Sequence, residues 1–278
     1  MAYAFLTTGS TTFAAGSWSD ATGFANSGTL AIESGSQTIV SALDQSALGT
    51  GLNYFNVGPL FSGDIGSPSA GSLKVDIDAG TDPHFTYAAS GGHCYLTAGG
   101  GNTLITRVEC NSNGGTLHLT GGIFTNLDVV RGTCTVNEST VVTNAYLVGG
   151  TTTIEYNATA LTILNIGGGT HTLKRTANTV ILSGGTLYVD IDSGSLGATI
   201  VTVTGGVLVL KSGAIPVAVF IGGRIDLSQI RKPSVIAGTS AVVYASFKGA
   251  LAQSPGNLVT WTTANISYRG SYTEVGEA

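Results

Sequence analysis

Apolar and polar residues alternate over short segments from about residue 114 onward. A glycine pair, once replaced by Arg131-Gly132, precedes each of these segments, and the fourth residue after every pair is aliphatic. The pairs recur every 16 to 21 residues, and such a repeat indicates a stack of similar structural units, which we call rungs. The second members of the pairs are Gly115, Gly132, Gly150, Gly169, Gly185, Gly206 and Gly223.

The phase of the aliphatic residues predicts which side chains face inward. Successive side chains of a strand point to opposite faces, so a residue type kept at one phase marks one face. A second strand is expected before each glycine pair, on the same reasoning. The predicted internal column is Leu119, Val136, Ile154, Leu173, Val189, Leu210 and Leu227. The inward pairs of the second strand are Leu127/Val129, Leu164/Ile166, Val180/Leu182 and Val201/Val203.

Two strands and two turns in about 18 residues predict an all-β chain built as a parallel β-solenoid. A right-handed β-helix with irregular rungs is favoured, because the regular aliphatic period of a left-handed hexapeptide helix is missing. We expect an N-terminal β docking or cap region at 1–65, the β-helix at 66–228, and a C-terminal cap or oligomerisation segment at 229–278. The outer segments lack the clean rung period.

Composition narrows the possible classes of protein. Only 10% of the residues are charged, where about 25% is typical. The net charge is −5 and no basic residue precedes Lys74, so the basic face that nucleic acid requires is not expected. The N-terminus has no basic stretch, so we expect no secretory signal. No apolar run is long enough to span a bilayer, so we expect no membrane span. The chain has three cysteines, an odd number, and no predicted secretory signal. We therefore expect these cysteines to be reduced thiols in a cytosolic protein.

Two acidic phrases are the strongest candidates for metal chemistry. Asp76 and Asp78, followed by a glycine, resemble the start of a calcium loop, but position 87, where the bidentate glutamate would stand, is Tyr87. The same spacing recurs at Asp190 and Asp192. We therefore favour a turn motif at a rung corner, with the aspartate capping its own turn.

Catalytic and zinc-binding arrangements are not predicted. Glycosidic cleavage needs paired carboxylates, and the sequence suggests no pair on one face apart from the two acidic phrases. Cys134, Thr152 and His171 each stand two residues after a glycine pair, where side chains are expected to face inward. This position favours a row of polar side chains inside the stack over a nucleophile with its base. His118 is expected to be solvated, and His93-Cys94 lacks the spacing of a zinc site. We expect no enzyme, no cofactor and no catalytic or metal-ligating residue.

Several short sequence segments stand in a characteristic order: Trp18, 32–39, 43–48, 61–66, the Gly-Gly-Thr segments, 226–228, 231–233 and 257–262. Their order resembles that in a group of tailed-phage and prophage proteins with Gly/Thr-rich β-helices, namely head decoration (cement) proteins. The resemblance covers most of the chain and implies a homotrimer on the outer capsid surface at three-fold positions. It implies the major capsid protein as partner, stabilisation of the expanded shell against DNA pressure, and synthesis in the host cytoplasm.

A tailspike or fibre adhesin is the alternative function. Such a protein would bind host surface glycans through outward aromatic residues such as Tyr146 or Tyr188, and a depolymerase would add carboxylates to the same groove. Under the decoration hypothesis, Trp261, Tyr268 and Tyr272 are candidate interface anchors, because aromatic residues are enriched at the centres of interfaces.

Overall fold

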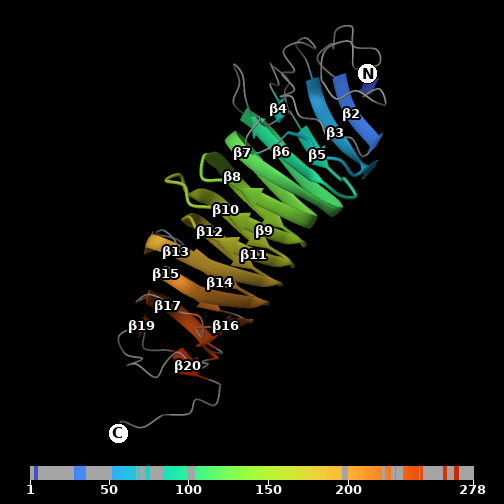
Figure 1. Ribbon diagram of the computed structural model, residues 1–278. Helices are drawn as coiled ribbons and strands as arrows, with labels where there is room; N and C mark the ends of the chain where they lie inside the picture. The colour runs from blue at the N-terminus through green and yellow to red at the C-terminus, as the bar shows by residue number, and fades with distance from the viewer. Residues whose placement is uncertain are drawn as a thin grey trace. The chain divides into compact units, whose positions relative to one another are not determined.

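The computed structural model describes part of the chain. The described residues are 3–5, 28–35, 52–66, 68, 73–75, 84–98, 104–195, 200–220, 223–226, 229, 234–243, 245–246, 259–261 and 266–268. They form an all-β structure without a helix, a parallel β-solenoid (Figure 1). The chain divides into two units. Unit 1 comprises Met1–Ala145 with Gly150–Thr152, and unit 2 comprises Tyr146–Gly149 with Thr153–Ala278.

Unit 1 contains two ladders of parallel strands. In one ladder β2, β3, β5 and β7 pair in sequence, and in the other β4, β6 and β7 pair. A run of 33 residues makes β7 long enough to serve both ladders. The strands are β1 (Tyr3–Phe5), β2 (Gly28–Gly35), β3 (Leu52–Phe61), β4 (Leu73–Val75), β5 (His84–Tyr87), β6 (His93–Ala98) and β7 (Leu104–Val136). β8 (Thr140–Leu147) and β9 (Thr151–Ile154) follow, each with residues in both units.

Unit 2 repeats the same arrangement of two ladders. Strands β10, β12, β14, β15 and β17 form one ladder, and β11, β13, β15, β16 and β18 form the other. The strands are β10 (Leu161–Ile166), β11 (Thr170–Leu173), β12 (Ala177–Leu182), β13 (Thr186–Ser195), β14 (Ile200–Val203) and β15 (Val207–Phe220). The remaining strands are β16 (Arg224–Asp226), β17 (Ser234–Val243), β18 (Ala245–Ser246), β19 (Val259–Trp261) and β20 (Ile266–Tyr268).

The length of a rung varies along the chain, as the register of paired strands shows. In unit 2, Leu161 lies beside Ala177 on the next rung, whereas Val180 lies beside Val201, so the second of these rungs is the longer. In unit 1, where His84 lies beside Arg107, the rung is longer again. Insertions between strands therefore change the rung length while the strands keep their parallel pairing.

The predicted inward residues form the core. Six members of the predicted column, from Leu119 to Leu210, are buried, and Leu227 lies outside the described residues. All eight inward candidates of the second strand are buried as well. Each buried aliphatic side chain contributes about 1.5–3 kcal/mol relative to an exposed one, before the cost in chain entropy. In unit 1 aromatic residues extend this core, since Phe55 and Phe85 stack with ring centroids 5.3 Å apart.

The corner glycines have the predicted left-handed conformation at six of the seven repeats. Gly206 has φ of 74°, and a Cβ there would lie 2.6 Å from the carbonyl oxygen of Gly185 on the preceding rung. Gly115 is the exception. It has no positive φ, but a Cβ at this position would overlap the hydroxyl of Tyr87 and the carbonyl of Gly91, so close approach requires glycine there.

Strand pairing does not change at the predicted boundaries of the β-helix. Within 1–65, β2 pairs with β3 in parallel, and β3 pairs with β5. Beyond residue 228, β17 pairs in parallel with β19 and β20. The described strands on both sides of the expected 66–228 segment therefore extend the parallel stack.

Candidate functional site

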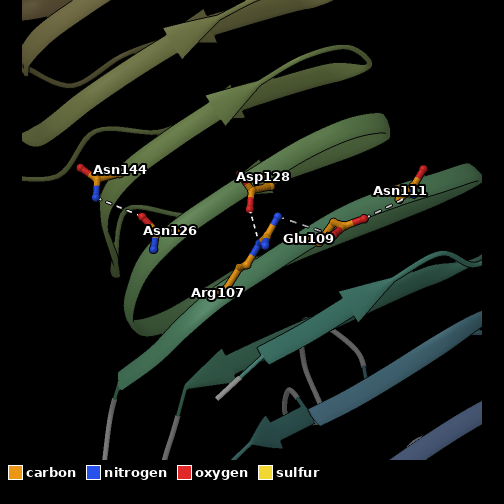
Figure 2. Close-up of polar contacts among 6 residues, drawn as sticks. All are labelled: Arg107, Glu109, Asn111, Asn126, Asp128 and Asn144. Carbon is orange, nitrogen blue, oxygen red and sulfur yellow. Dashed lines mark hydrogen bonds and ion pairs between the residues drawn. The ribbon is translucent and has the colours of Figure 1, made fainter. Parts of the chain in front are cut away.

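A row of polar side chains connected by hydrogen bonds and ion pairs lies on the outward face of β7 and β8; Figure 2 shows six of them. We call it the polar ladder; its members are Arg107, Glu109, Asn111, Asn126, Asp128, Arg131 and Asn144. Parallel stacking brings together groups of these side chains from successive rungs, which lie 18 to 21 residues apart in sequence.

The charged part of the polar ladder is organised around Arg107. Its Nε donates to Asp128 Oδ2 at 2.5 Å, and its Nη2 lies 3.9 Å from Glu109 Oε2. Two carboxylates thus share one face and one guanidinium, which corrects the expectation that only the two acidic phrases would bring acids together. The sequence carries no signal for this pair, because Glu109 and Asp128 lie on different rungs whose register it does not reveal.

Amide groups complete the polar ladder. Asn111 Nδ2 donates to Glu109 Oε1 at 3.4 Å, and Arg131 Nε donates to Asn111 Oδ1 at 2.6 Å. Asn144 Nδ2 donates to Asn126 Oδ1 at 3.1 Å. Most of these contacts join residues 18 to 21 positions apart, so the side chains link one rung to the next.

A depression adjoins the polar ladder on the same unit. It is lined by His84, Phe85, Thr86, Arg107 and Glu109. His84 and Thr86 lie beside Arg107 and Glu109 in the register of β5 and β7. The depression therefore presents an imidazole, a hydroxyl, a guanidinium and a carboxylate together.

A second outward cluster lies on β6 and β7 and contains two histidines. The rings of Tyr95 and His118 stack with centroids 4.4 Å apart and planes 7° apart, and His93 Nδ1 lies 3.1 Å from His118 Nε2. We call His93, Tyr95 and His118 the ring cluster. His118 is half-buried rather than solvated as expected, and burial, with a smaller contribution from His93, lowers its pKa. The stacked faces of Tyr95 and His118 cover each other, so that pair offers no shared aromatic platform to a sugar ring.

Unit 2 holds a charged cluster at the turn after β11. Lys174 Nζ lies 2.9 Å from both carboxylate oxygens of Glu155, and Arg175 Nε donates to the carbonyl oxygen of Glu155 at 2.6 Å. Arg175 is fully buried, and desolvation lowers its pKa to about 10 against the opposing effect of Glu155. Sequence reasoning did not identify Arg175, since an arginine beside a turn is ordinarily solvated.

One of the two acidic phrases and the outward-phase Tyr188 lie in the described part of the chain. Asp76 and Asp78 lie outside the described residues. Asp190 lies within β13 at a register shift, not in a turn, and accepts a hydrogen bond from Ser212 Oγ at 3.0 Å. Tyr188 is half-buried, with Lys211 Nζ 4.5 Å from the centre of its ring.

The inward polar residues are buried, as their phase predicts. Cys134 and Thr152 in unit 1 and His171 in unit 2 are at most 1% exposed. Thr152 Oγ1 has no hydrogen-bond partner, and His171 Nε2 contacts the carbonyl oxygen of Gly168. Cys94, Cys110 and Cys134 are free and buried, and burial raises the pKa of each thiol, that of Cys110 to about 11. None of the three is an activated nucleophile.

Within the described ranges, no three His, Cys, Asp or Glu side chains gather closely enough to enclose a metal ion. The same part of the chain includes no helix of the length and apolarity needed to cross a membrane. Comparison with models of known families, with curated proteins and with solved structures finds no match to this chain.

Proposed function

We propose that the chain is a head decoration (cement) protein of a tailed phage, bound as a homotrimer to the major capsid protein on the outside of the expanded shell. The observation that carries the proposal is that outward polar side chains form hydrogen bonds and ion pairs between neighbouring rungs. Arg107 with Asp128, Asn126 with Asn144, and Lys174 with Glu155 each join residues 18 to 21 positions apart. Side chains fixed in this way lose little further entropy when the surface packs against another protein.

The proposed mechanism is stabilisation by mass action. A protein that binds only the expanded shell stabilises it by RT ln(1 + [L]/Kd) per site, about 2.7 kcal/mol at a free concentration of 100 Kd. Three-fold symmetry would repeat one contact three times around each axis. Summed over the shell, such contacts oppose the pressure of the packaged DNA.

The proposal includes no catalytic activity. Hydrolysis of a glycosidic bond requires one carboxylic acid and one carboxylate on either side of an open sugar site. Glu109 and Asp128 are the carboxylates that share a face in the described part of unit 1, and both contact the guanidinium of Arg107 (Figure 2). We expect purified protein to leave host polysaccharide intact.

Glycan adhesion is the second candidate function, favoured by the depression beside the polar ladder. Its lining of His84, Thr86, Arg107 and Glu109 offers donors and acceptors suited to sugar hydroxyls. A glycan array probed with the full chain tests this candidate, and Arg107→Ala should abolish any signal that arises there.

Binding to purified heads tests the main proposal. Full-length protein is mixed with expanded heads that lack it, and with unexpanded heads as the control. We expect saturable binding to expanded heads alone and DNA release at a higher temperature than from undecorated heads. Failure to bind expanded heads, or equal binding to both forms with no change in the release temperature, would contradict the proposal.

A further inference from the structure

The two histidines of the ring cluster come together only through the stacking of rungs. His93 begins β6 and His118 lies 25 residues later in β7, where Tyr95 is the residue beside it in the strand register. Their facing nitrogens, His93 Nδ1 and His118 Nε2, are 3.1 Å apart. His93 is exposed, so an ion in solvent can reach this pair of nitrogens.

The surroundings hold the imidazole of His118 in position and anchor the backbone of His93. His118 stacks on Tyr95, and its other nitrogen, Nδ1, lies 2.7 Å from the hydroxyl oxygen of Thr135. In the tautomer with the proton on Nδ1, that proton is donated to Thr135 and the Nε2 lone pair is directed at His93. The backbone N–H of His93 donates to Asp64 Oδ1 at 2.8 Å. A second hydrogen bond that fixes the tautomer and orientation of an imidazole is the usual support of a metal-ligating histidine.

The spacing of the two nitrogens suits one transition-metal ion. Zinc binds imidazole nitrogen at about 2.0–2.1 Å. Two such bonds separate the nitrogens by about 2.9 Å at a right angle and by about 3.3 Å at the tetrahedral angle. The observed 3.1 Å lies between these limits.

We propose that His93 Nδ1 and His118 Nε2 bind one Zn²⁺, Ni²⁺ or Cu²⁺ ion on the outward face of unit 1, with water in the remaining coordination positions. The described part of the chain supplies no third His, Cys, Asp or Glu to the ion, so the site is open to an external ligand. In the metal-free chain with the His118 proton on Nδ1, His93 Nδ1 donates a hydrogen bond to His118 Nε2. The ion replaces this hydrogen bond, and in the bound form the proton of His93 resides on its Nε2. The proposal does not depend on the decoration function.

Calorimetric titration of the full chain with Zn²⁺ at pH 7.5 tests the site. The chain has four histidines, which allows a matched control. His93→Gln and His118→Gln should each weaken binding at least tenfold. His84→Gln, a histidine of the neighbouring ladder, should leave the affinity unchanged. Absence of a one-to-one binding event, an undiminished affinity in both ring-cluster variants, or a tenfold loss in His84→Gln would overturn the proposal.

A spectroscopic measurement on the unmodified chain covers the case in which a variant fails to fold. With one equivalent of Cu²⁺, electron paramagnetic resonance should show coupling to nitrogens of two imidazoles. A spectrum without imidazole coupling would place the ion on carboxylates such as those of the polar ladder and would refute the site.

Discussion

His171 Nε2 donates a hydrogen bond to the carbonyl oxygen of Gly168 at 2.6 Å, inside the core of unit 2. A carbonyl can only accept, so the imidazole carries its proton on Nε2, while its Nδ1 has no partner. Desolvation outweighs the hydrogen bond and lowers the pKa of His171. The buried ring is therefore held in its neutral form.

This arrangement predicts that the protein becomes less stable in mild acid. The unfolded chain takes up a proton at His171 near pH 6.5, while the folded chain does so only at lower pH. Because the unfolded state binds more protons in this interval, the free energy of unfolding falls as the pH drops below about 6.5. Urea denaturation at pH 7.5, 6.5 and 5.5 measures the slope.

The variant His171→Gln isolates this effect, since it retains a donor for Gly168 but has no group that titrates. Its free energy of unfolding should depend less on pH over the same interval. The pKa of His118 is also lowered, so His118→Gln should remove a separate part of the dependence. An identical pH slope in the unmodified protein and in both variants would contradict the assignment.

Ile154 tests the internal column. Its side chain is 1% exposed, and aspartate at this position would bury a charge without a partner. We expect Ile154→Asp to lower the free energy of unfolding by more than about 3 kcal/mol, or to prevent folding. Ile154→Val, the conservative control, should cost about 0.5–1.5 kcal/mol. A soluble aspartate variant with an unchanged melting temperature would mean that Ile154 does not face the core.

Two glycines of unit 2 should respond oppositely to alanine. Gly206 has φ of 74° and no space for a Cβ, so Gly206→Ala should destabilise the protein by more than about 1 kcal/mol. Gly167 has ordinary φ, and the nearest atom to a Cβ there would be 3.9 Å away. Gly167→Ala should therefore be neutral or slightly stabilising. Equal effects on the melting temperature would show that the corner does not require glycine.

The core could be predicted from the sequence because it depends only on how many residues separate a side chain from its glycine pair. Leu173 lies beside Val189, and Val189 beside Leu210, although the two intervening rungs differ in length. Insertions at corners leave the alternation within each strand unchanged, so the fourth residue after a glycine pair faces inward in rungs of either length. The buried positions of Cys134 and His171 follow from the same rule.

The outward clusters could not be predicted, because they depend on register between rungs of unequal length. His93 meets His118 across 25 residues, whereas Arg107 meets Asp128 across 21. No local spacing rule, such as those for zinc motifs, covers such distances. The burial of Arg175 also depends on tertiary packing, since its carbonyl partner belongs to Glu155, 20 residues earlier.

Cryo-electron microscopy of the virion tests the proposed decoration function most directly. The account predicts density for three copies of this chain around each occupied three-fold position on the outer surface of the expanded head, in contact with the major capsid protein. The copy number per virion would then be in the hundreds. A map that places the chain only on the tail, or as single copies on the head, would contradict the account.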